Sequence, residues 1–190
     1  SDNGPWWEGS AGGLRDRKGG SGWEGGYRAP FLARQPGRIP RGLVLDAMAM
    51  NIDLLPTLLS WAGAPWPTVE LDGRDLTALL SGLGGASPHE ELLLFDNEAI
   101  SAVRTQRWKY VVRSYYRTFD APLDTPTRAD WDVLVDLASD PEESYDVSSR
   151  HPDVAADMKA RLERARATFG PMARGAPAAP AAPAAAPTSR

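Results

Sequence analysis

The stretch ELLLFDNEAISAVRTQRWKYVV, residues 91–112, decides the fold of the C-terminal half of the chain. Short runs of leucine, β-branched and aromatic residues are separated by polar residues, which is typical of β-strands and their turns. A similar apolar run follows farther along the chain. The predicted strands are residues 92–95, 100–104, 108–112 and 133–137. The second and third are predicted to form a hairpin that turns near residues 105–107.

Two other segments have the apolar spacing of helices. Residues 152–169 carry apolar side chains three or four positions apart, with charged side chains mostly on the other side. Residues 53–62 are the second predicted helix, which Asp53 caps and Gly63 ends. Residues 30–34, a short apolar run before Pro36, are predicted to be a buried strand.

The composition restricts the class of protein. The 190 residues have a net charge of −4 and include no cysteine. An acidic chain is a poor partner for nucleic acid, and a chain without cysteine has no disulfide, no cysteine nucleophile and no thiolate metal site. No apolar run reaches the ~18 residues of a membrane span. Residues 171–190 are rich in alanine and proline, and we expect them to be a disordered tail.

The first candidate site is SDNGP at residues 1–5. The carboxylate of Asp2 and the amide of Asn3 are hard oxygen ligands, which suit calcium or magnesium better than zinc. The same residues are also common in an ordinary turn. Because the chain begins with serine inside this motif, we expect its N-terminus to be cut.

The second candidate is LRDRKGG at residues 14–20, where Arg15, Arg17 and Lys18 lie among glycines. Backbone N–H groups and a lysine can hold a sulfate or phosphate, although a solvated basic loop has the same composition. Next, WEGGYRAPF at residues 23–31 indicates a loop packed tightly onto a strand, with Glu24 and Arg28 as an ion pair.

The order of the motifs is more specific than any one of them. The motifs that follow are IDLLPTLL (52–59), AGAP (62–65), LDGRDL (71–76), AVRT (102–105), WKY (108–110) and DPE (140–142). Over roughly residues 1–171 this series resembles the C-terminal half of the sulfatase family, and within that family the arylsulfatases.

The resemblance implies an α/β fold of the alkaline-phosphatase type. Residues 1–90 would be the C-terminal part of the catalytic domain, and residues 91–170 a small α+β subdomain of antiparallel sheet and helix. It also implies hydrolysis of aryl or carbohydrate sulfate esters by a formylglycine nucleophile, with calcium, or alternatively magnesium, as the metal. Asp2 and Asn3 would be metal ligands and Lys18 would contact the sulfate. A periplasmic or secreted location is favoured by the resemblance alone.

The chain also departs from the family. Lys18 lies five positions before Trp23, where family members usually have four, and Gln35 stands where they often have tryptophan. Asp2 and Asn3 cannot supply the roughly six to eight oxygens that calcium takes, and no Cys/Ser-x-Pro-x-Arg motif occurs. We therefore expect a missing N-terminal half to supply both, and this chain alone to be inactive.

Other interpretations stay open. A phosphodiesterase or phosphonate hydrolase of the same superfamily would share the metal site. A non-catalytic module that packs on a partner or binds sugar is a third function, although half of an α/β sheet would leave apolar faces exposed. His89 and His151 are expected on the surface. Candidates for stacking on an aryl or sugar ring are Trp6, Trp7, Tyr115 and Tyr116.

Overall fold

A four-stranded antiparallel sheet with the strand order β1-β2-β3-β4 organises the C-terminal half of the protein. The computed structural model describes residues 3–6, 8–18, 22–96, 99–112 and 132–169. The strands are β1 (Leu92–Asp96), β2 (Ala99–Arg104), β3 (Trp108–Val111) and β4 (Val133–Asp136). All four predicted strands are confirmed to within a residue, and β2 and β3 form the predicted hairpin.

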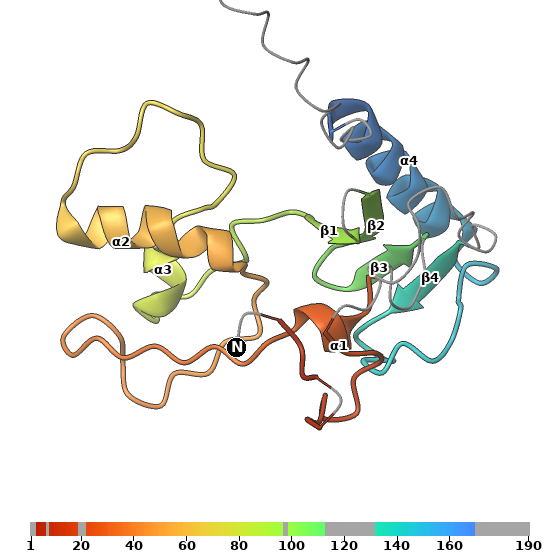
Figure 1. The fold of residues 1–190 in the computed structure, drawn as a ribbon, viewed down its shortest axis with the longest axis horizontal. Helices are drawn as coiled ribbons and strands as arrows, with labels where there is room; N and C mark the ends of the chain where they lie inside the picture. The colour runs from red at the N-terminus through yellow and green to blue at the C-terminus, as the bar shows by residue number, and fades with distance from the viewer. Residues whose placement is uncertain (1–2, 7, 19–21, 97–98, 113–131, 170–190) are drawn as a thin grey trace, which may run out of the picture.

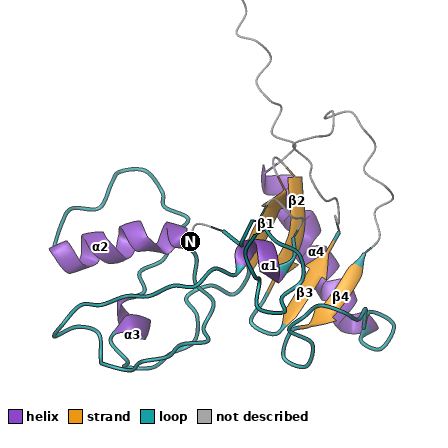
Figure 2. Cartoon of the chain, turned by 60° about the horizontal axis from the view of Figure 1, so that its bottom comes forward, coloured by secondary structure: helices purple, strands orange, loops and turns teal. Residues whose placement is uncertain are grey.

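Both faces of the sheet are covered (Figure 2). Helix α4 (Pro152–Phe169) packs on one face through Met158 and Leu162, which are both 1% exposed. The short helix α1 (Glu24–Tyr27), together with Trp23, covers the other face. The predicted helix at residues 152–169 is therefore confirmed. Because successive side chains of a strand point to opposite faces of the sheet, the sheet has an apolar core on each face.

A second group of elements lies beside the sheet (Figure 1). It contains the 3-10 turn η1 (Asn51–Asp53), α2 (Leu54–Ala62) and α3 (Thr77–Leu80). Helix α2 ends as predicted at Gly63, which has a left-handed φ of 62° that glycine adopts without strain. The core of this group is small: its buried hydrophobic cluster consists of Leu76, Leu79 and Leu80.

The predicted capping role of Asp53 is wrong, because its side chain caps no N–H of α2. The carboxylate instead accepts hydrogen bonds from the backbone N–H groups of Met50 and Arg74, each at 2.7 Å. The loop that contains Arg74 folds back over the start of the helix. The N–H group of Arg74 binds the Asp53 carboxylate, which is therefore not used to cap α2.

The predicted strand at residues 30–34 is also wrong. These residues are irregular and exposed, with Phe31 55% and Leu32 95% accessible. A strand is stable only when a neighbour accepts and donates its backbone hydrogen bonds, and no described strand pairs with this segment. The tail at residues 171–190 lies outside the described residues. None of the described helices has the length and hydrophobicity needed to cross a lipid bilayer.

Candidate functional site

Three N-terminal segments meet at one place beside the sheet. The N–H of Gly4 donates to the carbonyl of Gly26 at 3.1 Å, and the N–H of Gly25 donates to the carbonyl of Arg15 at 2.8 Å. The N–H of Lys18 donates to the carbonyl of Pro5 at 3.0 Å. These bonds connect the segment of Asn3, the loop of Lys18 and helix α1 to one another, so the two predicted site motifs are neighbours.

Glycine allows this close approach. A Cβ atom at Gly4 would lie 1.7 Å from the carbonyl oxygen of Gly25, and one at Gly25 would lie 2.2 Å from the carbonyl oxygen of Asp16. Any side chain at either position would therefore push the segments apart. Gly25 of the WEGG motif thus serves the close packing predicted from the sequence, but residues 24–27 form helix α1 instead of a loop, and Gly25 packs on the backbone of Arg15 and Asp16 instead of a strand.

The structure places two of the three predicted site residues. Asn3 and Lys18 are half-buried on the connected segments, and Oδ1 of Asn3 is buried. Asp2 lies outside the described residues. Of the aromatic candidates Trp6 is 45% exposed, and Trp7, Tyr115 and Tyr116 lie outside the described residues.

A buried cluster of charges holds α1 on the sheet. Nζ of Lys109, which is fully buried on β3, lies 2.8 Å from Oε1 of Glu24 and 2.7 Å from Oε1 of Glu143. Arg104, the cross-strand neighbour of Lys109, donates from Nε to the same oxygen of Glu24 at 3.0 Å. The carboxylate of Glu24 thus lies between two cations that would repel each other on adjacent strands, and Glu143 is a second carboxylate beside Lys109.

Burial and charge act in opposite directions on the two carboxyls. Burial raises the pKa of Glu143, and the nearby ammonium of Lys109 does not fully offset this. Burial also acts to raise the pKa of Glu24, but Lys109 and Arg104 together hold it below its ordinary value. Glu24 is therefore the carboxylate that is more firmly ionised in this cluster.

Glu143 bonds to the N-terminal segments with both its side chain and its backbone. Its Oε2 accepts the N–H of Glu24 at 2.6 Å, and its carbonyl accepts the guanidinium of Arg15 at 2.7 Å. It does so with a left-handed φ of 57°, which is uncommon outside glycine. The guanidinium of Arg15 also stacks over Trp23, 3.8 Å from the ring centre.

These contacts correct the sequence interpretation. The Glu24–Arg28 ion pair is wrong, because Glu24 pairs with Lys109 and Arg104. Lys109 and Glu143 were not predicted as site residues. Lys109 stands in the WKY motif and Glu143 directly follows the DPE motif, but nothing in either motif indicates that they meet.

A second buried polar cluster surrounds Asp53, whose side chain is fully buried. Nε2 of His89 lies 2.8 Å from Oδ1 of Asp53, and the His89 side chain is only 9% exposed. The expected surface position of His89 is therefore wrong. His151 lies beside the Trp108 ring at 5.0 Å between ring centres and is half-buried. The pair of Asp53 and His89 connects α2 to the loops around it.

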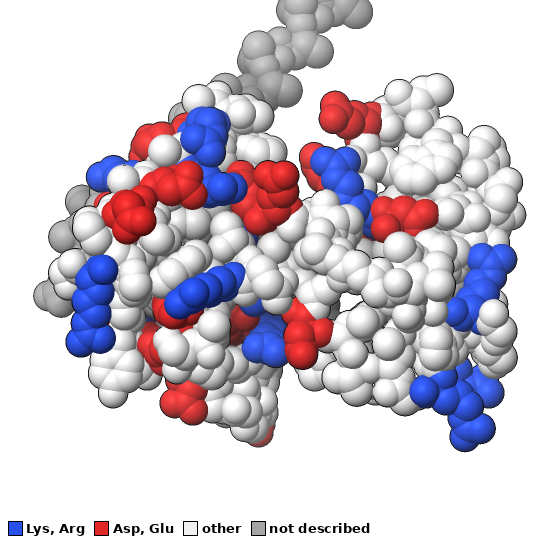
Figure 3. Space-filling view, turned by 180° about the vertical axis from the view of Figure 1, so that it is seen from behind, with Lys and Arg blue, Asp and Glu red and all other residues white. Residues whose placement is uncertain are grey.

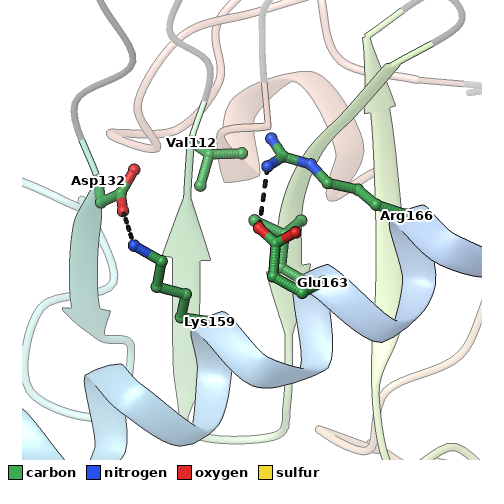
Figure 4. A pocket seen from close by; sticks show the side chains of 6 residues that line it. Val112, Asp132, Lys159, Glu163 and Arg166 are labelled. Atoms are coloured by element: carbon green, nitrogen blue, oxygen red, sulfur yellow. Dashed lines mark hydrogen bonds and ion pairs between the residues drawn. The ribbon is translucent and has the colours of Figure 1, made fainter. Parts of the chain in front are cut away.

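A polar hollow of about 310 Å³ lies where β3 and β4 meet α4 (Figure 4). Lys159 lies 3.6 Å from Asp132, and Arg166 lies 3.1 Å from Glu163. The charged groups in this hollow thus neutralise one another in pairs. It lies on the α4 face of the sheet, away from the segments of Asn3 and Lys18.

The oxygen ligands near α1 are of the type that a hard cation prefers, but they are too few to complete its coordination. An amide oxygen such as that of Asn3 suits calcium or magnesium. In the described part of the chain, no three His, Asp or Glu side chains gather into a metal site. A cation bound by Asp2 and Asn3 would therefore need further oxygen ligands from elsewhere.

Comparison with known proteins identifies the family. Residues 21–168 match the family model described as N-sulphoglucosamine sulphohydrolase, C-terminal. Human arylsulfatase A is 36% identical over 92% of this chain and 40% of its own length. Rat steryl-sulfatase is 34% identical over 77% of this chain and 30% of its own length. This chain therefore spans well under half the length of these relatives.

Solved structures have the same fold. The PsFucS1 sulfatase from Pseudoalteromonas sp. aligns with a TM-score of 0.73 and 24% identity over 92% of this chain and 37% of that chain. BT33336S-sulf, from a Bacteroides thetaiotaomicron locus for glycosaminoglycan metabolism, aligns with a TM-score of 0.62 and 26% identity over 82% of this chain and 32% of that chain. The fold is thus that of the C-terminal subdomain of sulfuric ester hydrolases, the class with an alkaline-phosphatase-like fold. The chain belongs to the sulfatase family.

Proposed function

We propose that this chain is the C-terminal part of a longer calcium-dependent sulfatase that hydrolyses aryl or carbohydrate sulfate esters. The observation that carries the proposal is the hydrogen-bonded meeting of the Asn3 segment, the Lys18 loop and α1. Upstream residues of the longer protein would supply a formylglycine nucleophile and the remaining metal ligands. A calcium ion, or alternatively magnesium, would neutralise charge on the sulfate oxygens.

The residues of this chain would have distinct tasks. Asp2 and Asn3 would each give an oxygen to the metal. Lys18 would donate to a sulfate oxygen and stabilise the charge that develops as the ester bond breaks. The backbone bonds between Gly4 and Gly26 and between Lys18 and Pro5 would keep these groups in fixed relative positions.

The exposed surface of α2 supports the idea of a longer protein. Leu55 and Leu58 are 52% and 58% exposed on this helix, and on the face shown in Figure 3 the half of the molecule with α2 and α3 carries fewer charges than the sheet half. Soluble proteins rarely leave such apolar faces uncovered. We propose that the upstream part of the same protein packs there, which argues against a stand-alone module.

The test is an assay of the full-length protein with an aryl sulfate and, in parallel, with a phosphate diester. Turnover of the sulfate that Asp2→Ala abolishes together with bound calcium supports the proposal. Preferred turnover of the diester would identify the phosphodiesterase alternative instead. An Asp2→Ala protein with unchanged activity and metal content would contradict the metal assignment.

A further inference from the structure

Stability alone does not explain why a lysine is buried at position 109. Its ammonium is fully buried between two carboxylates, and removing charged groups from water is costly even when they are paired. Apolar residues of similar volume would commonly stabilise such a site equally well. The geometry of the cluster therefore suggests a second role for these charges.

The contacts of Glu143 lead from Lys109 to the N-terminal segments. Lys109 binds Glu143, and Glu143 accepts the N–H of Glu24 and the guanidinium of Arg15. The carbonyl of Arg15 then accepts the N–H of Gly25, and the adjacent Gly26 accepts the N–H of Gly4. The chain of contacts thus runs from the middle of β3 to the residue beside Asn3, and through Arg15 to the loop of Lys18.

We propose that Lys109 is a positioning residue of the sulfatase site, which acts through Glu24 and Glu143 to hold α1 and the segments of Asn3 and Lys18 in their reactive arrangement. This inference rests on the proposed function. Lys109 itself lies on the sheet and touches the site only through other residues. The C-terminal subdomain thereby contributes to catalysis although it need not contact the substrate.

The experiment replaces Lys109 with methionine in the full-length protein, which keeps an unbranched side chain one atom shorter and removes its charge. Small misplacements of reacting groups can cost about 10²-fold in rate, so we expect kcat to fall by at least about tenfold, with a smaller change in KM. Hydrogen exchange should become faster at the amides of Gly4 and Gly25 but not in the β2–β3 ladder.

Two further variants separate positioning from stability. Leu162→Ala destabilises the sheet from the α4 face, where it touches none of the charged cluster, so it should lower the melting temperature and leave kcat unchanged below it. Adding Glu143→Gln to Lys109→Met removes the uncompensated carboxylate and keeps an acceptor for the N–H of Glu24, so kcat should partly recover. If Lys109→Met does not fold, Glu143→Gln alone is compared with Leu162→Ala.

The outcomes distinguish the two proposals. An unaltered full-length protein that turns over no sulfate ester would overturn the proposed function, and this inference with it. An active unaltered protein whose Lys109→Met variant keeps its kcat, or loses no more than Leu162→Ala does, would leave the proposed function standing and overturn the positioning role.

Discussion

The two halves of the described chain differ in how completely they bury their own apolar residues. The half with the sheet has a core on each face, and Val103, Val111 and Leu134 are fully buried. The half with α2 and α3 buries a small leucine cluster and leaves Leu58 and Val69 58% and 67% exposed. The sheet half is thus largely self-sufficient in its packing, whereas the α2 half needs a partner surface.

The largest effect is expected when the chain is separated from the rest of the protein. Residues 1–190 alone should show no turnover of an aryl sulfate, even with added calcium, because the nucleophile and most metal ligands would be absent. In the same sample, amides of α2 should exchange quickly while those of β2 and β3 stay protected. Turnover by the purified chain would contradict the first expectation, and equal protection of both halves would contradict the second.

The second test concerns the Lys18 loop, which lies on the sheet half. It identifies which cation of this loop contacts the sulfate. Lys18→Ala in the full-length protein should lower kcat about 10²-fold, as the loss of one electrostatic donor typically does. Arg17→Ala is the matched control, because it changes a neighbouring cation of the same loop. If Arg17→Ala loses activity and Lys18→Ala does not, the sulfate contact belongs to Arg17.

The third test uses a matched pair of leucines, one in each half. Leu162→Ala should lower the free energy of unfolding by about 2–5 kcal/mol in both the isolated chain and the full-length protein, because it opens a cavity in a closed core. Leu58→Ala should change it by less than about 0.5 kcal/mol in the isolated chain, as exposed positions do. In the full-length protein we expect the Leu58 variant to lose about 2 kcal/mol or more.

Urea denaturation of both variants in both contexts measures these differences. A Leu58→Ala effect that stays near zero in the full-length protein would show that nothing covers this part of α2.

The smallest effect concerns the edge of the sheet half. A hydrogen bond from Arg107 holds the pKa of Asp136 below its ordinary value. The ionised carboxylate therefore stabilises the folded state above the unfolded pKa of about 3.9, and this contribution is lost as pH falls through the folded pKa. Asp136→Asn should lower the urea midpoint at pH 7, and the difference should shrink below about pH 4. A difference that is constant with pH would contradict the role of charge.

Local patterns predicted the local structure well. The runs of β-forming residues in 92–112 located β1, β2 and β3. The apolar spacing in residues 152–169 located α4, because that spacing reports which side of a helix is buried. Residues 30–34 have the same apolar character but no described strand beside them. An apolar run shows that a segment needs covering, and the partner decides whether it becomes a strand.

Contacts between side chains far apart in the sequence could not be predicted from local patterns. Glu24 meets Arg104, Lys109 and Glu143, all at least 80 positions away, and spacing alone favoured the nearby Arg28. In the same way Asp53 was predicted to cap its own helix but binds the loop of Arg74 and the side chain of His89. Such pairings depend on the topology of the sheet and loops, which local propensity does not contain.

The left-handed backbone of Glu143 has a consequence for protein engineering. At this φ, glycine would be the residue that relieves backbone strain, and a designer who optimised local propensity would choose it. Glycine would also delete the carboxylate that binds Lys109 and the N–H of Glu24. The best residue for the backbone and the best residue for the network therefore differ at one position. A redesign that scores residues one at a time would choose wrongly there, and one that scores Glu24, Lys109 and Glu143 together would keep the glutamate.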